Sequence, residues 1–187
     1  MIGCARGPVK AIQELIDVVT EDWVANGRDW TRPGFRALAV HRFGNWRMEV
    51  HSPLARAPLS VLYRAAFRFV RNHYGIELPY SAKVGRQVVI EHQGGIVVHG
   101  DSVIGDRCVI RQGVTLGMKN VSKPFDSPTL GAGVDVGAGA VVLGAITVGA
   151  GASIGANSVV LQDVEAGALA VGVPAQAKKK KKPATGS

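Results

Sequence analysis

His92 and Glu77 have the residue types of an acid–base pair. A histidine titrates near neutral pH and can remove a proton from a hydroxyl group, and a neighbouring carboxylate fixes its tautomer. His92 lies in the segment Glu91-His92-Gln93-Gly94-Gly95, fifteen residues after Glu77. Glu91 is adjacent in the chain and is expected to point elsewhere. Taken alone, a single histidine is more often an ordinary surface residue, so the elements around His92 decide its role.

From residue 83 onward, aliphatic residues recur every six positions, and we call these positions the ladder. The longest unbroken series is Leu130, Val136, Val142, Val148, Ile154 and Val160. Upstream, the same period holds for Val98, Ile104, Ile110 and Leu116. Val84 and Ile90 keep it too, but two extra residues intervene around Gly94-Gly95. Two positions before each ladder residue the side chain is small or aliphatic. Cys108 is one of these, so we expect it to be a buried filler rather than a reactive thiol.

A period of six indicates a solenoid of short parallel strands. Three strands make one triangular coil of about eighteen residues, and each ladder side chain points inward and stacks on the next coil. Small residues at the corners permit backbone conformations that bulky side chains resist. Because Glu77 precedes His92 by close to one coil, the two side chains are expected to be near each other. His92 sits where the register breaks, and we therefore expect it to be exposed.

The chain changes character near residue 80. Residues 1–80 are predicted to be a helical region, 81–176 the solenoid, and 177–187 a lysine-rich disordered tail. Apolar spacing predicts helices over about 9–19, from Phe35 to Trp46, and from Leu59 to about His73. The last is basic and amphipathic and could lie on a membrane surface. The better interpretation is that its apolar face packs on the solenoid. Residues 117–129 interrupt the ladder as an ejected loop, which is expected to be functional.

Composition narrows the classes of partner. The net charge is +8, but residues 178–182 are five consecutive lysines, and the balance elsewhere is ordinary. The run indicates a solvated tail, and nucleic acid is not an expected partner. No window approaches 18 uninterrupted apolar residues and no signal peptide is evident, so stable membrane insertion is not expected. With only Cys4 and Cys108, a disulfide framework is excluded and a reducing cytoplasm is expected.

Several segments resemble the bacterial serine O-acetyltransferases, which are acetyl-CoA-dependent hexapeptide-repeat enzymes. These segments are 34–38, 42–46, 91–98, 112–117 and 172–175. The resemblance implies a mainly β fold with some α structure: a left-handed parallel β-helix preceded by helices. It also implies O-acetyl transfer from acetyl-CoA to the hydroxyl of a small acceptor by direct attack. In this family the acceptor is L-serine, and the activity belongs to cysteine biosynthesis in the cytoplasm.

The resemblance assigns roles to four acidic or basic side chains. His92 matches the family's general base, and Glu77 matches the aspartate that pairs with that base. Glu91 matches an acidic residue just before the base. Asp29 matches an aspartate of the helical region that binds the amino group of the acceptor. Glu91 and Asp29 are therefore expected to bind substrate.

Acetyl-CoA is expected to contact Met118, Ala138 and Ala156. In the relatives the pantetheine lies along the backbone at the positions that match the two alanines. Acetyl-CoA is the only cosubstrate implied, and no metal ion is expected.

The ejected loop departs from the family pattern. The relatives have Arg-His before a proline, where the pair helps to hold the serine carboxylate, and this chain has Asp126-Ser127-Pro128. Asp126 and Ser127 thus take substrate-binding positions, but exchanging a cation for an anion weakens the binding of a carboxylate. Poor use of serine is expected unless another cation replaces the pair, and the nearest are Lys119, Lys123 and Arg111.

Other interpretations stay open. Without a replacement cation, a sugar or polysaccharide-precursor hydroxyl becomes the better acceptor. Some left-handed β-helix proteins resemble carbonic anhydrases that bind zinc through three histidines between subunits, and this solenoid has two, His92 and His99. A non-catalytic scaffold is a further alternative. In the family the active sites form between neighbouring chains, so a homotrimer is expected. A hexamer is not, because the helical region lacks the extension that pairs two trimers.

Overall fold

The computed structural model describes residues 8–179 and begins with three α-helices. They are α1 (Pro8–Ala25), α2 (Pro33–Trp46) and α3 (Pro53–Phe69), with a 3-10 helix at Arg47–Glu49 and a π-helical turn at Val70–Tyr74. The three predicted helices are confirmed. However, α3 begins six residues before Leu59. Its start is set by Ser52, whose side chain accepts a hydrogen bond from the Ala55 N–H (3.4 Å), and by Pro53, which fits the first turn.

Fifteen short strands follow the helices in the described part of the chain. They are β1 (Ile76–Glu77), β2 (Lys83–Val84), β3 (Val89–Glu91), β4 (Ile96–Val98), β5 (Val103–Ile104), β6 (Val109–Arg111), β7 (Thr115–Gly117), β8 (Thr129–Leu130), β9 (Asp135–Val136), β10 (Val141–Leu143), β11 (Thr147–Val148), β12 (Ser153–Ile154), β13 (Val159–Val160), β14 (Ala168–Gly172) and β15 (Ala175–Lys179).

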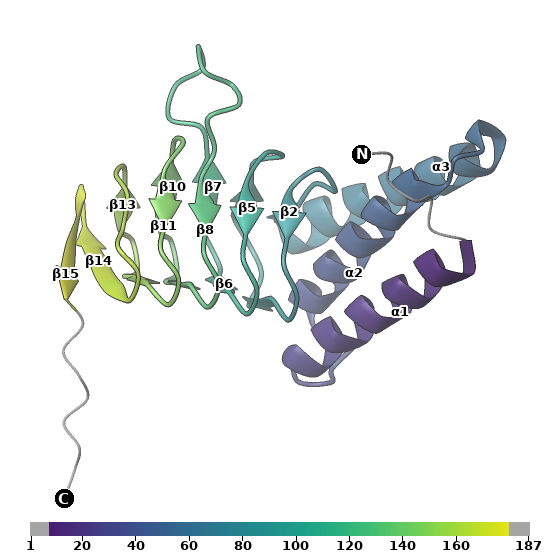
Figure 1. The fold of residues 1–187 in the computed structure, drawn as a ribbon, viewed down its shortest axis with the longest axis horizontal. Coiled ribbons are helices and arrows are strands. Elements are labelled where there is room, and N and C mark those ends of the chain that lie inside the picture. The colour runs from purple at the N-terminus through teal and green to yellow at the C-terminus, as the bar shows by residue number, and fades with distance from the viewer. Residues whose placement is uncertain (1–7, 180–187) are drawn as a thin grey trace, which may run out of the picture.

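Three parallel sheets form the sides of the solenoid. One sheet has the order β1-β4-β7-β10-β13, the second β2-β5-β8-β11, and the third β3-β6-β9-β12-β14, with β15 antiparallel at its end. From β1 to β13, every third strand therefore lies in the same sheet, as a triangular coil requires. Figure 1 shows the coils stacked in a row. The predicted parallel β-helix is confirmed.

The ladder forms the core of this solenoid. From Ile90 to Val160 every ladder residue is at most 3% exposed, whereas Val84 at the first coil is half-buried. Cys108 is fully buried, and its Sγ donates a hydrogen bond to the Gly131 carbonyl (3.1 Å). Burial raises the pKa of the Cys108 thiol. The prediction that Cys108 fills space in the ladder, rather than acting as a nucleophile, is confirmed.

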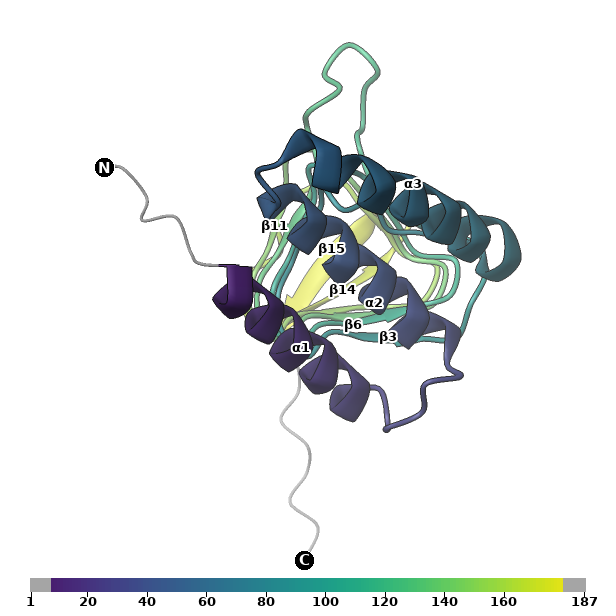
Figure 2. The same cartoon turned by 90° about the vertical axis from the view of Figure 1, so that its right-hand side faces the viewer.

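The three helices cover the end of the solenoid nearest β1 and β2, as Figure 1 and Figure 2 show from two directions. Helix α2 approaches β3 so closely that a Cβ at Gly34 would lie 2.1 Å from the Ile90 carbonyl oxygen. Only glycine fits there. The contact fixes the beginning of α2 next to the strand that leads into His92.

A buried ion pair ties the helices to the first coil. The Arg42 Nε lies 2.8 Å from Asp22 Oδ2, and both side chains are at most 7% exposed. The same guanidinium donates hydrogen bonds to the Val84 and Gly85 carbonyls. Burial raises the pKa of the Asp22 carboxyl, and Arg42 opposes that shift. Arg42 thus links α1, α2 and the segment after β2.

The two ends of the solenoid differ from the sequence prediction. Strand β1 begins at Ile76, before residue 81, because Ile76 and Glu77 pair with β4 although they lie outside the ladder period. At the other end, residues 177–179 belong to β15, so the prediction of a disordered tail from residue 177 is wrong for these three residues. Their backbone pairs with β14 in spite of the lysines. The rest of that tail lies outside the described residues.

The packing of α3 also differs from expectation. Its buried residue is Tyr63, which meets Tyr80 edge to face at 5.5 Å, while Leu62 and Phe69 are 58% and 48% exposed. The prediction that the apolar face of this helix packs on the solenoid is therefore wrong for Leu62 and Phe69, because the helix turns Tyr63 toward the protein, whereas Val70 from the same predicted face does join the buried core. Within residues 8–179, no helix is long and apolar enough to cross a membrane.

Candidate active site

His92 lies at an exposed corner of the solenoid, between β3 and β4. Its backbone is left-handed (φ 67°), and Gly94 and Gly95 follow with φ of 97° and 67°. Left-handed backbone is uncommon for a residue with a Cβ. Three such residues within four positions turn the chain sharply, and they place His92 outside the core at the register break.

Backbone hydrogen bonds stack the corners of successive coils along this side, which we call the glycine edge. At 2.8–2.9 Å they join Gly94 N to Tyr74 O, Gly113 N to Gly94 O, Gly139 N to Gln112 O, and Asn157 N to Ala138 O. A Cβ at Gly95 or Gly113 would lie 3.2–3.3 Å from a glycine Cα on the next coil. The glycines allow this close stacking, and His92, Ala138 and Ala156 all lie along this edge.

Glu77 lies in β1, and its backbone pairs with Val97 in β4, the strand that follows the His92 corner. The Gly75 corner stacks directly on Gly94, with a Gly75 Cβ placed 3.0 Å from the Gly94 Cα. Glu77 is therefore on the coil next to His92, half-buried. Among the described residues, no hydrogen bond or ion pair connects these two side chains.

Glu91 and Asp29 already have partners. Glu91 Oε2 lies 2.9 Å from Arg111 Nε, and Arg111 also binds Asp135. The hydrogen bond with Asp135 is the main cause that raises the pKa of Arg111. Asp29, in the turn between α1 and α2, accepts hydrogen bonds from the Thr31 hydroxyl (2.6 Å) and the Thr31 N–H (2.8 Å), and these lower the pKa of its carboxyl. Arg111 is thus occupied and is not a free cation for an acceptor.

A pocket of about 220 Å³ lies beside His92. It is lined by Arg32, Pro33, Gly34, Ile90, Glu91 and His92. Pockets for drug-sized ligands usually measure roughly 300–1,000 Å³, so this one suits a small molecule or one unit of a larger molecule. Sequence reasoning missed Arg32, although its place just before Pro33-Gly34, the start of the segment that resembles the family, was the available signal.

The loop residues lie on a different edge of the solenoid. Met118, Asp126 and Ser127 belong to the segment between β7 and β8, whereas His92 lies between β3 and β4. Figure 2 shows this loop projecting away from the coils. Within one chain, the structure therefore brings His92, Ala138 and Ala156 to one edge and does not bring Met118, Asp126 or Ser127 to it.

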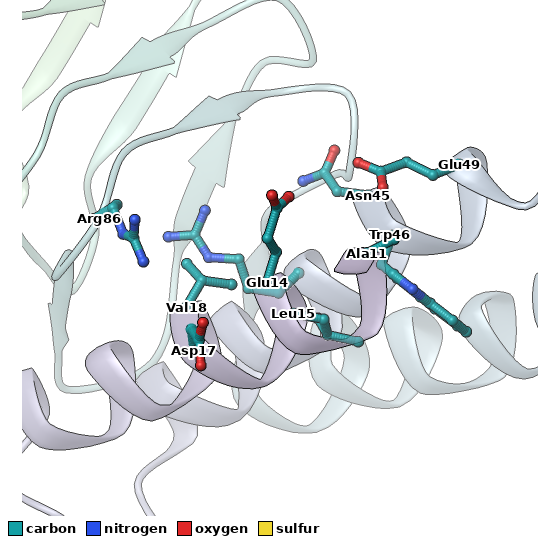
Figure 3. A pocket seen from close by; sticks show the side chains of 10 residues that line it. Ala11, Glu14, Leu15, Asp17, Val18, Asn45, Trp46, Glu49 and Arg86 are labelled. Carbon is teal, nitrogen blue, oxygen red and sulfur yellow. The ribbon is translucent and has the colours of Figure 1, made fainter. Parts of the chain in front are cut away.

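A larger pocket, of about 600 Å³, lies between α1 and the C-terminal end of α2. Figure 3 shows the Glu14 carboxylate projecting from α1 toward the side of Asn45, with Arg86 and Glu49 at opposite sides of the pocket. None of the predicted site residues lines it. Pocket size alone would thus point away from the residues whose types and spacing indicate chemistry.

His99 has surroundings different from those of His92. Its Nδ1 accepts a hydrogen bond from the Asp101 N–H (3.2 Å) and lies 3.7 Å from the Asp101 carboxylate. In the part of the chain that the structure describes, no group of three or more His, Cys, Asp or Glu side chains is placed to hold a metal ion.

Known proteins similar to this chain share both sequence and fold. A serine acetyltransferase from Helicobacter pylori J99 is 41% identical over 144 residues, which cover 77% of this chain and 80% of that protein. A protein of Escherichia coli K12 that is named putative colanic acid biosynthesis acetyltransferase WcaB is 38% identical over 132 residues. The match covers 68% of this chain and 78% of that protein. The structure of Brucella abortus serine acetyltransferase with coenzyme A matches 94% of this chain and 72% of that one, with a TM-score of 0.77 and 28% identity.

The extent of these matches varies. The chain spans 44% to 64% of the length of three further serine acetyltransferases, at 37% to 44% identity. No family model matches the chain.

Proposed function

Since this chain belongs to the serine acetyltransferase family, we propose that it transfers the acetyl group of acetyl-CoA to a hydroxyl group of a small acceptor, L-serine or a close analogue. The observation that carries the proposal is the glycine edge, where an exposed histidine shares one edge of closely stacked corners with Ala138 and Ala156. A histidine at this corner has room for an acceptor on one side and for a thioester along the edge.

His92 acts as the general base in this proposal. Its imidazole removes the proton of the acceptor hydroxyl, and the oxygen attacks the thioester carbonyl carbon to form a tetrahedral oxyanion. Backbone N–H groups stabilise that charge. When the C–S bond breaks, the imidazolium returns the proton to the departing thiolate, so the products are an acetyl ester and CoA. Direct transfer needs no acetyl-enzyme, in keeping with a buried Cys108.

Glu77 is proposed as the residue that orients the His92 ring from the neighbouring coil. A carboxylate in this role holds one ring N–H and leaves the other nitrogen free to accept a proton. Met118, on the loop edge, reaches this site only from another chain. We therefore propose that the loop residues Met118, Asp126 and Ser127 of one protomer complete the site on the glycine edge of its neighbour.

A homotrimer would provide this arrangement, because the loop edge of each solenoid would then meet the glycine edge of the next. We expect sedimentation equilibrium to give three times the protomer mass of 19.6 kDa. A stable monomer with full activity would contradict the shared site. By relation to its family, the protein is further proposed to work in the cytoplasm, in cysteine biosynthesis.

A sugar hydroxyl is the second candidate acceptor. Two observations favour it: the chain covers 78% of WcaB, a polysaccharide-related acetyltransferase by name, and the loop has Asp126-Ser127 in place of a basic pair. Release of CoA thiol from acetyl-CoA, measured with L-serine, glycerol and neutral monosaccharides in parallel, separates the two. The proposal expects acceptor-dependent release, and a rate that no acceptor changes would contradict it.

The loop offers a direct test of how serine is held. Replacing Asp126→Arg together with Ser127→His removes an anion and adds a cation, so we expect the apparent KM for L-serine to fall by about tenfold, the gain of one charge-assisted contact. The measurement is the initial rate against serine concentration, with Ser122→Ala in the same loop as the control. An unchanged KM would show that the loop does not reach the acceptor.

A further inference from the structure

We propose that Arg32 binds an anionic group of the acceptor beside His92, so that the acceptor is a hydroxyl compound with a nearby carboxylate or phosphate and needs no amino group. The inference rests on the proposed function for the acetyl transfer itself. The binding of the acceptor to Arg32 does not depend on that function. It assigns an acceptor-positioning role to a residue of the turn between α1 and α2.

Among the described residues, Arg32 is a cation without an ion pair beside His92. It lines the same 220 Å³ pocket as His92 and Glu91. Nη1 donates a hydrogen bond to the Asn26 carbonyl (3.2 Å), which orients the group without neutralising it. Within residues 8–179, no carboxylate lies within 4 Å of Arg32. Asp29 is the nearby acid: its carboxylate accepts hydrogen bonds from the Thr31 hydroxyl and N–H, and it attracts Arg32 only over a longer distance, without forming an ion pair.

The other arginines nearby, Arg111 and Arg36, do not line the pocket. Arg111 binds Glu91 and Asp135. Arg36 donates to the Tyr74 hydroxyl (2.6 Å) and the Trp30 carbonyl (3.0 Å). Glu91 is the only carboxylate among the residues that line the pocket, and Arg111 neutralises its charge. The charge of Arg32 therefore makes the pocket positive. Such a pocket favours an anionic ligand.

The position of Arg32 relative to His92 is fixed by a buried side chain. Asn26 is fully buried, and its Nδ2 donates to the Asp22 carbonyl (2.7 Å) and to the Val88 carbonyl (3.0 Å). Its Oδ1 accepts from the Ile90 N–H (3.4 Å). Asn26 thus joins the end of α1 to β3, two residues before His92, and the same residue supplies the carbonyl that holds Arg32.

The two carboxylates expected to bind substrate are less available to an amino group. Glu91 is paired with Arg111, and Asp29 accepts two hydrogen bonds from Thr31. An ammonium group would have to compete with these partners, whereas a carboxylate or phosphate meets Arg32 without displacing a charged group. The site therefore selects for the anion of the acceptor rather than for its amine.

Three acceptors of nearly equal size separate these features. L-Serine carries a carboxylate and an amine, L-glycerate only the carboxylate, and serinol (2-amino-1,3-propanediol) only the amine. We expect kcat/KM for L-glycerate to exceed that for serinol by about tenfold or more in the unmodified protein. In Arg32→Gln, kcat/KM should fall by about 10- to 100-fold for serine and for glycerate, because KM rises. For serinol, kcat/KM should fall by less than about threefold.

Two further variants sharpen the test. Arg32→Lys keeps the charge but loses the planar fork, so part of the preference for glycerate should return. Arg28→Gln removes a charge from the same turn outside the pocket and should leave the preference unchanged. Equal kcat/KM for serinol and glycerate in the unmodified protein, or equal losses for both in Arg32→Gln, would overturn the inference.

A binding measurement keeps this test separate from the proposed reaction. L-Glycerate and serinol are titrated without acetyl-CoA while the histidine ring protons are followed by NMR, with His92→Gln used to assign its signal. Glycerate that shifts the His92 signal in the unmodified protein and not in Arg32→Gln supports the anion site even if no acceptor is acetylated, and only the proposed function would then fail. Binding of glycerate that is independent of Arg32 would refute the site.

Discussion

Replacing His92→Ala is expected to lower acetyl transfer by about 10²- to 10⁴-fold, the usual contribution of a general base. The side chain lies at an exposed corner outside the ladder, so its removal leaves no cavity in the core. Acetyl-CoA binding should be nearly unchanged because Ala138 and Ala156 lie farther along the glycine edge. The measurements are kcat from thiol release, acetyl-CoA affinity by calorimetry, and thermal unfolding.

His99→Ala is the matched control for this variant. His99 lies on the next corner and interacts with Asp101, away from the pocket beside His92. Its loss should change the rate by less than about threefold. Equal losses in the two variants would contradict a general-base role for His92 and would favour a shared structural or metal-binding role.

Arg42→Ala should lower the free energy of unfolding by about 3–5 kcal/mol, because breaking a buried ion pair leaves an unpaired charge. In this case the Asp22 carboxylate loses its partner, and the Val84 and Gly85 carbonyls lose a donor. Urea denaturation measures the change, with the protomer concentration held constant because assembly contributes to stability.

Arg86→Ala is the control, since Arg86 pairs with Glu21 at 2.7 Å but is 57% exposed. An exposed pair contributes about 0–1 kcal/mol. A large effect at both positions would mean that the helices are held to the first coil by charge in general. An effect below 1 kcal/mol at Arg42 would mean that the buried pair does not anchor them.

The solenoid could be predicted from sequence because its core repeats. A period of six in aliphatic residues has few structural explanations, and it identified the buried ladder from Ile90 to Val160 as well as the role of Cys108. The helical region lacks such redundancy. The orientation of α3 depends on whether Tyr63 or Leu62 faces the protein, and apolar spacing allows both. Likewise, β15 forms by backbone pairing with β14, which a run of lysines does not reveal.

The site could be predicted only in part, for a related reason. The break at Gly94-Gly95 marks the His92 corner in the sequence, and the stacking of coils places Ala138 and Ala156 on the same edge. Arg32 was missed because its approach to His92 depends on contacts between distant segments. Asn26 binding to the Val88 carbonyl and Gly34 packing on Ile90 are both of this kind. The loop residues Asp126 and Ser127 lie on another edge, and one chain alone cannot bring them to His92.

The most direct measurement follows isotopically labelled acetyl from acetyl-CoA into product. The unmodified protein and His92→Ala are incubated with L-serine, L-glycerate and a neutral monosaccharide, and CoA thiol and acetyl esters are quantified together. One labelled ester per CoA released, in the unmodified protein and nearly absent in His92→Ala, is the expected result. CoA release without any ester, or ester formation that persists in His92→Ala, would contradict acetyl transfer by a His92 base.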